Sequence, residues 1–142
     1  MPNTIYFVIM NIPLNQTEKD LLRKIVPHAQ LLMMLDSNEL QTLIPQIIEQ
    51  IRATPKLYEQ EQKGMKALVY LHYFFNQSDW YVSELNLEED LAFGYVCLNG
   101  DHEMAEIGYF SISELVSIAV INIDLHWTYQ TLEQAIQQSN HP

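Results

Sequence analysis

Residues 67–74 read ALVYLHYF, and residues 80–85, 91–98 and 106–111 read WYVSEL, LAFGYVCL and EIGYFS. In these four stretches aromatic and β-branched side chains recur with a period of two, which predicts β-strands. The links between the stretches are short and polar, and the last link contains the turn signal Asn99-Gly100. Short links favour antiparallel neighbours, so we expect a meander of strands after Gly64.

Helices are expected before this sheet. Asn15 can cap a helix, because Glu18 follows it at the spacing of a capping box, and Pro27 then ends or kinks that helix. A second helix is expected from Asp36 or Ser37, with an interruption at Pro45.

A third, short helix is expected over residues 55–64. Thr54 and Pro55 form a pair typical of a cap and a first turn, and Gly64 is suited to end the helix.

The remaining segments complete an α+β pattern. Residues 4–10 and 120–127 are rich in β-branched residues, which predicts two further strands. Ser111 has a glutamate three residues later, which predicts a short helix, and residues 131–138 predict a last one. We therefore expect one α+β domain over residues 1–142, with N-terminal helices, a four- or five-stranded mainly antiparallel sheet and an inserted short helix.

Two glycines are expected to be structural. Gly94 and Gly108 each lie inside an aromatic strand, where glycine marks a bulge or a close approach of another group. A valine at position 108 is therefore expected to destabilise the fold.

The formal charge of −11 is distributed unequally along the chain. No lysine or arginine follows Lys66, whereas acidic residues continue to Glu133. Such a one-sign half repels phosphate backbones and anionic membranes and attracts basic protein surfaces or cations. The acidic residues of the predicted turns are the expected electrostatic site for a partner: Glu88, Glu89, Asp90, Asp101 and Glu103.

Motifs for catalysis, cofactors or metals are not found in the sequence. The four glycines are isolated, no G-x-S-x-G elbow occurs, and the single cysteine, Cys97, cannot form a zinc site with others. We expect Cys97 to be a buried strand residue in a protein of the reducing cytoplasm. No cofactor, metal ion or catalytic residue is therefore assigned.

Two interpretations remain open for the polar strand residues. Glu84 and Glu106 stand beside aromatic residues and could perform acid–base chemistry in an apolar pocket, but they could also be ordinary edge-strand glutamates. His72 and His126 lie in predicted strands, where a half-buried, hydrogen-bonded histidine is expected.

The aromatic residues are expected to form the core. An aromatic platform stacks single-stranded bases only with flanking basic residues, and residues 67–142 contain no lysine or arginine. Direct nucleic-acid binding by this half is not expected.

Five segments resemble the family called domain of unknown function 2958. They are PKLYEQE (55–61), WYVSEL (80–85), DLAFGYV (90–96), AEIGYFSISEL (105–115) and INIDLHW (121–127). Their order and spacing are similar to the family pattern over roughly residues 45–135, whereas residues 1–44 are an atypical extension. The motif residues carried over are Tyr58, Trp80, Glu84, Phe93, Gly94, Glu106, Gly108, Tyr109, Glu114 and Asp124.

The chain departs from this pattern at two places. The loop before Trp80 is shorter than usual, and Asn122 and Ile123 stand where the family typically has glutamate and arginine. The resemblance implies a protein carried by plasmids, integrative elements or phages, with no established activity.

Three hypotheses about function follow. The first is a non-enzymatic acidic protein of a mobile genetic element that mimics nucleic acid and inhibits a host defence system, such as a CRISPR effector or a restriction enzyme. The second is a small enzyme or ligand-binding domain whose aromatic pocket contains Glu84, Glu106 or Asp124. The third is dimerisation or partner docking through the helices of residues 15–53.

Overall fold

A computed structural model describes residues 13–139. The main sheet contains β2 (Leu71–Phe75), β3 (Ser78–Asn86), β4 (Leu91–Cys97), β5 (Glu106–Ser111) and β6 (Asn122–Ile123). A separate two-stranded pair joins β1 (Leu68–Val69) to β7 (Gln130–Thr131). The helices are α2 (Gln16–Ile25), α3 (His28–Leu35), α4 (Asn38–Gln41), α5 (Ile44–Ala53), α6 (Ile112–Val116) and α7 (Leu132–Ser139), with a 3-10 helix η1 (Glu61–Lys66).

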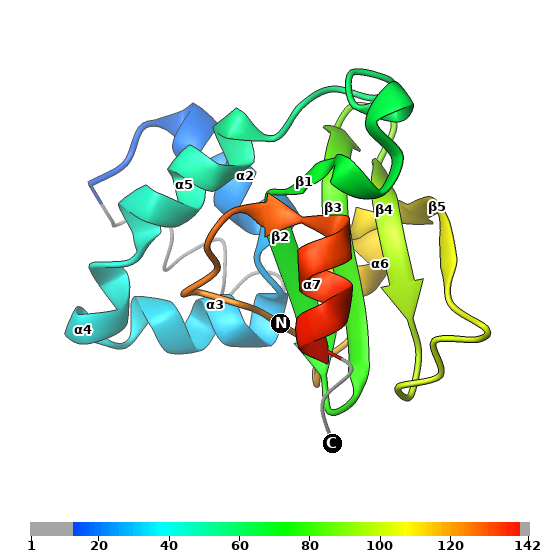
Figure 1. The fold of residues 1–142 in the computed structure, drawn as a ribbon. Coiled ribbons are helices and arrows are strands. Elements are labelled where there is room, and N and C mark those ends of the chain that lie inside the picture. The colour runs from blue at the N-terminus through cyan, green and yellow to red at the C-terminus, as the bar shows by residue number, and fades with distance from the viewer. Residues whose placement is uncertain (1–12, 140–142) are drawn as a thin grey trace.

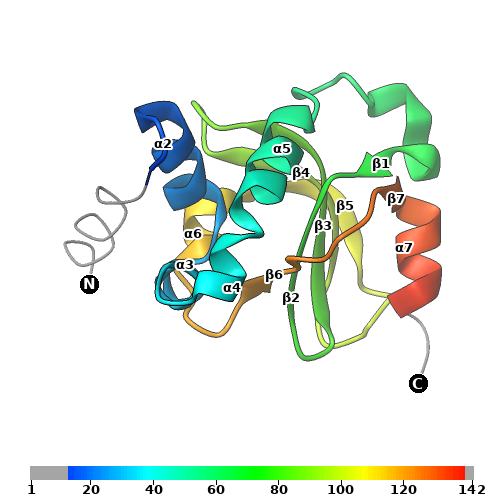
Figure 2. The same ribbon diagram turned by 90° about the vertical axis from the view of Figure 1, so that its left-hand side faces the viewer.

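These elements form three layers (Figure 1). The five strands pair antiparallel in the order β5-β4-β3-β2-β6. Helices α2 to α6 lie on one side of the sheet, and α7 lies on the other (Figure 2). The predicted α+β class, with helices first and then an antiparallel sheet with an inserted short helix, is confirmed.

The start signals predicted at Asn15 and Ser37 are confirmed. The side chain of Asn15 accepts a hydrogen bond from the Glu18 backbone at 2.8 Å, and the Glu18 carboxylate accepts one from the Asn15 backbone at 3.1 Å. Pro27 separates α2 from α3, and Ser37 caps α4. Pro45 lies in the first turn of α5, where its missing N–H leaves no carbonyl without a partner.

The apolar stripes of the N-terminal helices pack against the sheet. Ile25 and Ile47 are fully buried in one cluster with Leu71 and Val82 of the strands. The Tyr73 hydroxyl donates a hydrogen bond to the carbonyl of Ile25, which ties β2 to the end of α2. These stripes therefore form the larger core of the domain.

A smaller core lies on the opposite face, beneath α7. It joins Tyr81, Tyr95 and Cys97 of the sheet to Trp127 and Leu132. Cys97 is completely buried, as predicted, and burial raises the pKa of its thiol. Because α7 is short, it covers only part of this face.

The predicted helix over residues 55–64 is wrong. Thr54 ends α5 instead of starting a new helix, Lys56 forms an isolated bridge with Leu85, and residues 57–60 form turns in which Tyr58 has a φ of 76°. Only residues 61–66 are helical, as η1. The cause is a long-range contact, since Glu84 of β3 binds two backbone N–H groups of this segment and thereby replaces helical hydrogen bonds.

The predicted strand over residues 120–127 is reduced to Asn122–Ile123. The outer edge of β6 is closed by Gln30, whose side-chain amide donates to the carbonyl of Ile123 and accepts from its N–H. The Asp124 carboxylate then accepts from the N–H of His126, which turns the chain away. The strand predicted over residues 4–10 lies outside the described residues.

Gly94 and Gly108 differ, although the sequence suggested one role for both. A Cβ at Gly94 would lie 1.7 Å from the carbonyl oxygen of Tyr81, so the predicted close approach is confirmed there. A Cβ at Gly108 would meet nothing within 4 Å. The expectation for Gly108 is therefore wrong, because its neighbours on the edge strand leave open space.

The structure predicts opposite outcomes for these two glycines. Gly94→Ala should lower the free energy of unfolding by about 1–3 kcal/mol or more, because β3 must move away from β4. Gly108→Val should change it by less than about 0.5 kcal/mol, or raise it, because valine suits an open strand position. Urea unfolding of both variants tests this, and a larger loss for Gly108→Val would contradict it.

Candidate functional site

Strand β3 places the Glu84 side chain in a buried position, where it holds a distant segment of the chain by hydrogen bonds. The register between β3 and β4 shifts between Val82 and Glu84, which places Glu84 opposite Phe93. Its carboxylate accepts from the backbone N–H of Tyr58 at 2.9 Å and of Gln60 at 2.6 Å. With 2% exposure and both oxygens bonded, Glu84 fixes the segment before η1.

Gln60 completes this anchor. Its side-chain amide donates to the carbonyls of Leu68 and Ser83 and accepts from the N–H of Leu68. The segment is thus joined to β1 and β3 at once, which leaves Tyr58 65% exposed beside the sheet.

Several family-motif residues form one row across the sheet. Glu84 lies opposite Phe93, and Phe93 lies opposite Tyr109, with the two rings 5.0 Å apart. A hydrogen bond with the Tyr58 hydroxyl raises the pKa of Tyr109. Tyr58, Glu84, Phe93 and Tyr109 are therefore brought together, and their geometry is that of a packed and hydrogen-bonded cluster.

Other motif residues lie elsewhere. Trp80 packs against the helix-side core, and Gly94 and Gly108 face each other across β4 and β5. Glu106 is exposed on the edge strand β5, and Glu114 is exposed on α6, where its N–H binds the capping hydroxyl of Ser111. Glu84 and Glu106 do not converge with Asp124, so the three carboxylates named for acid–base chemistry form no common site.

Asp124 instead converges with two residues that the sequence did not single out as a site. His72 of β2 lies between two carboxylates: its Nε2 is 2.7 Å from Asp79 Oδ1, and its Nδ1 is 3.5 Å from Asp124 Oδ2. His72 is 13% exposed, Asp79 16% and Asp124 31%. The predicted half-buried, hydrogen-bonded histidine is confirmed at this position, whereas His126 lies exposed in a turn.

The backbone holds this trio in place. The N–H of Asp124 donates to the carbonyl of His72 at 2.8 Å, which fixes the exit of β6 beside β2. The His72 ring stacks on Tyr81 at 4.6 Å between centroids and contacts Trp127 at 5.0 Å. The Trp127 indole N–H in turn donates to the carbonyl of Val69.

Two carboxylates stabilise the charged form of His72. Burial alone would lower the pKa of His72, but the hydrogen bonds and charges of Asp124 and Asp79 outweigh it, and the pKa is raised above 6.5. The hydrogen bond with His72 lowers the pKa of Asp124 below 3.8. Both ring nitrogens face an acceptor, so the site favours the imidazolium form of His72, which can donate in both directions.

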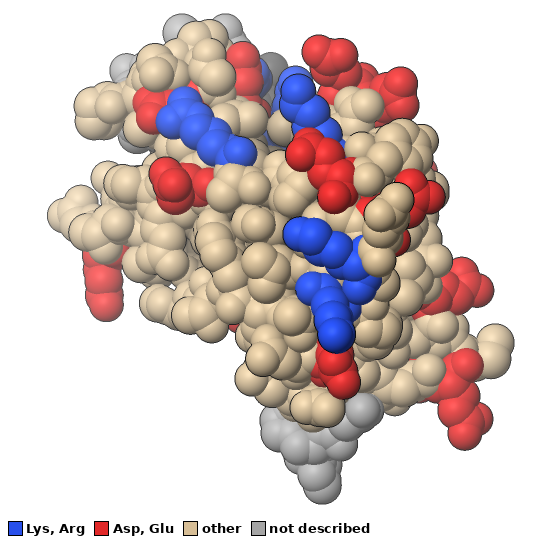
Figure 3. Space-filling model, turned by 45° about the horizontal axis from the view of Figure 1, so that its top comes forward, with Lys and Arg blue, Asp and Glu red and all other residues tan. Residues whose placement is uncertain are grey.

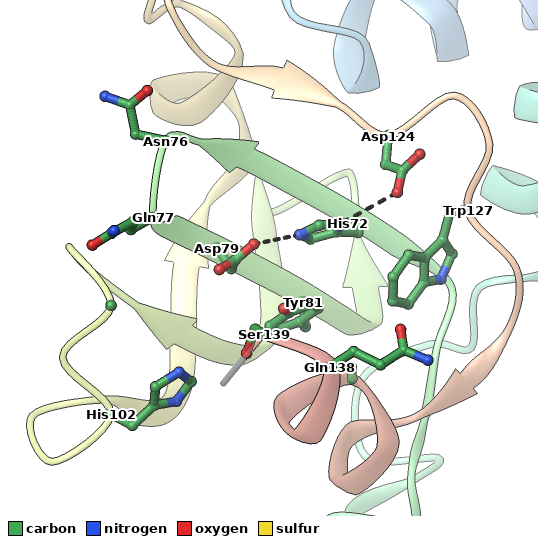
Figure 4. A pocket seen from close by; sticks show the side chains of 12 residues that line it. His72, Asn76, Gln77, Asp79, Tyr81, His102, Asp124, Trp127, Gln138 and Ser139 are labelled. Carbon is green, nitrogen blue, oxygen red and sulfur yellow. Dashed lines mark hydrogen bonds and ion pairs between the residues drawn. The ribbon is translucent and has the colours of Figure 1, made fainter. Parts of the chain in front are cut away.

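The trio lies at the side of a pocket of about 630 Å³ (Figure 4). The pocket lies between the exposed end of this sheet face and the last turn of α7, next to the β2–β3 and β4–β5 turns. Its lining residues are His72, Asn76, Gln77, Asp79, Tyr81, Gly100, His102, Asp124, Trp127, Ala135, Gln138 and Ser139.

The two turns that border the pocket are tied together. The N–H of Gly100 donates to the carbonyl of Gln77, and the N–H of Asn99 donates to the Ser78 hydroxyl, each at 2.9 Å. His102 faces the pocket from the β4–β5 turn, with its Nδ1 2.9 Å from the Tyr95 hydroxyl.

The five acidic turn residues fall into two groups at opposite ends of β4. Glu88, Glu89 and Asp90 precede the strand, and Asp101 and Glu103 follow it. Seven strand residues separate the groups by roughly 20 Å at the usual rise per residue. Asp90 also binds the hydroxyls of Ser111 and Ser113, so its carboxylate is engaged in holding α6.

A local signal for part of the pocket was present in the sequence. The two-residue turn Asn76-Gln77 sets the β2–β3 register, so His72 lies opposite Tyr81 and diagonal to Asp79. No local signal shows that Asp124 reaches the same histidine, because β6 joins β2 from fifty residues further along the chain.

The sequence matches the family described as "Protein of unknown function (DUF2958)" over residues 40–131, well over half of the chain. The chain belongs to the DUF2958 family. No curated protein and no solved structure matches it. The DUF2958 match includes the Glu84 anchor and the His72 trio but ends before the pocket residues of α7.

Two further findings apply to residues 13–139 of this DUF2958 protein. No group of three or more His, Cys, Asp or Glu side chains is placed there to hold a metal ion. None of the helices described there is long and apolar enough to cross a membrane.

Removing the charge of Glu84 should loosen the segment it holds. Glu84→Gln keeps the volume but has one acceptor oxygen, so one backbone N–H would face an NH₂ group. We expect a loss of about 1–3 kcal/mol in unfolding free energy, together with faster amide hydrogen exchange at residues 57–60. Glu88→Gln, at an exposed position, is the matched control; unchanged exchange in Glu84→Gln would contradict the anchor role.

The trio of His72, Asp79 and Asp124 should make the free energy of unfolding depend on pH, with one loss at alkaline pH and another at acidic pH. The raised pKa of His72 gives stability that is complete below pH 6.5 and lost as the pH rises through the folded value. The lowered pKa of Asp124 gives stability that is complete above pH 3.8 and lost as the pH falls through its folded value. Both contributions to stability are therefore complete between pH 3.8 and pH 6.5.

Urea unfolding at pH 6.0 and pH 8.5 tests the alkaline side. The wild-type protein should be more stable than His72→Gln by about 1–3 kcal/mol at pH 6.0, and this difference should shrink at pH 8.5. A difference that is the same at both pH values would show that His72 is not held as an imidazolium.

Proposed function

We propose that this protein is a cytoplasmic protein-binding module that uses the acidic end of its sheet to bind a basic protein surface. The observation that carries the proposal is the separation of charge: every lysine and arginine lies in residues 1–66, and the described residues that line the two hollows at one end of the sheet include acidic side chains but no lysine or arginine. Opposite charge steers association and favours basic partners.

The two acidic groups at the ends of β4 have different surroundings. Glu88 and Glu89 line a hollow together with Arg52 and Lys56, so side chains of both signs lie at this end of the sheet. Asp90 lines another hollow with basic side chains of α2. In Figure 3, which brings this end of the molecule forward, blue and red side chains lie next to each other.

The opposite end of the sheet differs in this respect. We call it the acidic end and define it by Asp79, Asp101, Glu103, Glu106 and Asp124. None of the described residues that line its two hollows is a lysine or an arginine. Asp101, Glu103 and Glu106 are exposed, whereas Asp79 and Asp124 lie in the pocket.

A nucleic-acid-binding protein is the proposed class of target. Channels that bind DNA or RNA are rich in Lys and Arg, and spaced carboxylates can occupy the positions of phosphates. The resemblance to proteins of mobile elements favours a host defence complex, such as a CRISPR effector or a restriction enzyme. The protein would act as an inhibitor by binding, without catalysis.

A second candidate function is ligand binding. The pocket of about 630 Å³ has the size typical of small-molecule sites, and Tyr81 and Trp127 contribute aromatic surface. The enzymatic version of this hypothesis has less support, because Glu84 is used as an anchor and Glu106 lies outside the pocket.

Charge reversal at the two ends of β4 tests the proposed function. The wild-type protein, Asp101→Lys/Glu103→Lys and Glu88→Lys/Glu89→Lys are used as bait, and association rates with the partner captured by the wild type are measured at several salt concentrations. We expect the first double variant to slow association on the order of tenfold, and the second much less. The wild-type rate should fall steeply with salt, because exposed charges are screened.

Competition identifies the surface that the partner uses. A short DNA duplex should displace the protein from a partner whose nucleic-acid channel it occupies. Equal rates for both double variants at high and low salt would contradict binding through the acidic end.

A further inference from the structure

The pocket at the acidic end carries more negative than positive charge. Asp79 faces it from β3, Asp124 from the segment after β6, and His72 from β2. His102 also lines the pocket and is engaged with the Tyr95 hydroxyl, the Tyr81 ring stacks on His72, and His126 lies beside Asp124, on whose carboxylate its charge acts. With His72 protonated, two carboxylates face one imidazolium, which leaves about one net negative charge.

The carboxylates of Asp79 and Asp124 differ in how closely they interact with His72. Asp79 is the closer partner of His72, at 2.7 Å, and is the more buried of the two. Asp124 is twice as exposed and lies 3.5 Å from the ring. Its Oδ1 accepts from the N–H of His126 and its Oδ2 faces the His72 ring, so each oxygen has one partner and a second lone pair for a further donor.

We propose that this pocket binds a guanidinium or ammonium group, with the Asp124 carboxylate as its principal acceptor. Pairing a planar guanidinium with a carboxylate gives short, charge-assisted hydrogen bonds. Asn76, Gln77 and Ser139 also line the pocket and add polar surface to its wall. At about 630 Å³ the pocket is far larger than a bare ion needs and accommodates an organic cation.

The bound cation competes with the proton on His72. A guanidinium beside Asp124 neutralises the charge that the imidazolium otherwise neutralises, and two cations in the pocket repel each other. Binding should therefore release the His72 proton, and the affinity for a cation should rise with pH. An anionic ligand would show the opposite pH dependence.

This inference rests on the proposed function for the source of the cation. A basic protein surface offers arginine and lysine side chains, and one of them would enter the pocket while Asp101 and Glu103 contact the surrounding surface. A free organic cation has the same chemistry, so the experiment must distinguish the two sources.

The test uses the blocked peptide acetyl-Gly-Arg-Gly-amide as the probe. Its binding to the full chain is followed by NMR at the Trp127 indole and the His72 ring. The same peptide with citrulline has nearly the same shape and no charge. We expect saturable shifts with arginine and none with citrulline; equal shifts with both peptides would overturn the proposal.

Variants locate the site and test the coupling. Asp124→Asn should weaken binding at least about fivefold, as expected for the loss of a half-exposed charge-assisted hydrogen bond. Glu133→Gln, an exposed position of α7 outside the pocket, removes the same charge and should have no such effect. Affinity should rise from pH 6.0 to pH 8.5 in the wild-type protein but not in His72→Gln. Equal weakening by Asp124→Asn and Glu133→Gln, or a wild-type affinity that falls with pH, would overturn the proposal.

Two comparisons separate this inference from the proposed function. If N-propylguanidine, a free guanidinium compound with the same single charge as the blocked peptide, binds at least tenfold more tightly than the peptide, a side chain of a protein partner is overturned as the source of the cation. If the peptide does not bind but charge reversal at Asp101 and Glu103 still slows association, only the pocket inference fails. If the peptide binds but charge reversal has no effect, the pocket retains its cation chemistry and the proposed function fails.

Discussion

The sheet face opposite the N-terminal helices depends on one constraint, the β-bulge at Ser83. In a regular pairing Glu84 would lie opposite Ala92, on the side of the helix core, where an unpaired carboxylate is costly. The bulge places it opposite Phe93 instead, on the other face. Gly94 permits this, because the Tyr81 carbonyl occupies the space of its missing Cβ. Beyond the bulge Glu84 holds the segment before η1, and before it Tyr81 supports the His72 ring.

The features that could be predicted from the sequence are those with local causes. The capping box at Asn15, the period of two in the strands and the hairpin turns each depend on residues within a few positions of one another. The segment at residues 55–64 shows the opposite case. Thr54 and Pro55 have a helix-start pattern, but the backbone follows the carboxylate of Glu84, which is more than twenty residues away. In WYVSEL the core-side residues Val82 and Leu85 stand three positions apart, which breaks the alternation at the bulge. No local pattern shows, however, that the Glu84 carboxylate binds the backbone of Tyr58 and Gln60.

Only the part of the pocket that the β2–β3 hairpin forms could be predicted from the sequence. The Asn76-Gln77 turn fixes which residues of β2 and β3 are neighbours, whereas Asp124 reaches His72 only because β6 pairs with β2. Gln30, which closes the outer edge of β6, comes from a helix more than ninety residues earlier. The total charge was plain from composition, but the fold was needed to show which carboxylates lie near basic side chains. Glu88 and Glu89 share a hollow with Arg52 and Lys56, whereas none of the described residues that line the two hollows of the acidic end is a lysine or an arginine.

The absence of lysine and arginine after Lys66 has a consequence inside the pocket as well as on the surface. Where Asp79 and Asp124 converge, the cation between them is a histidine, and its charge depends on pH where that of an arginine would not. The electrostatic field of the acidic end therefore varies with one protonation event. A cationic side chain from a basic partner would take over the neutralising role of that proton. If the protein acts as proposed, the exposed carboxylates would increase the rate of encounter with a basic surface, and the pocket would discriminate among the surfaces that arrive, because only a cation can neutralise it without the proton.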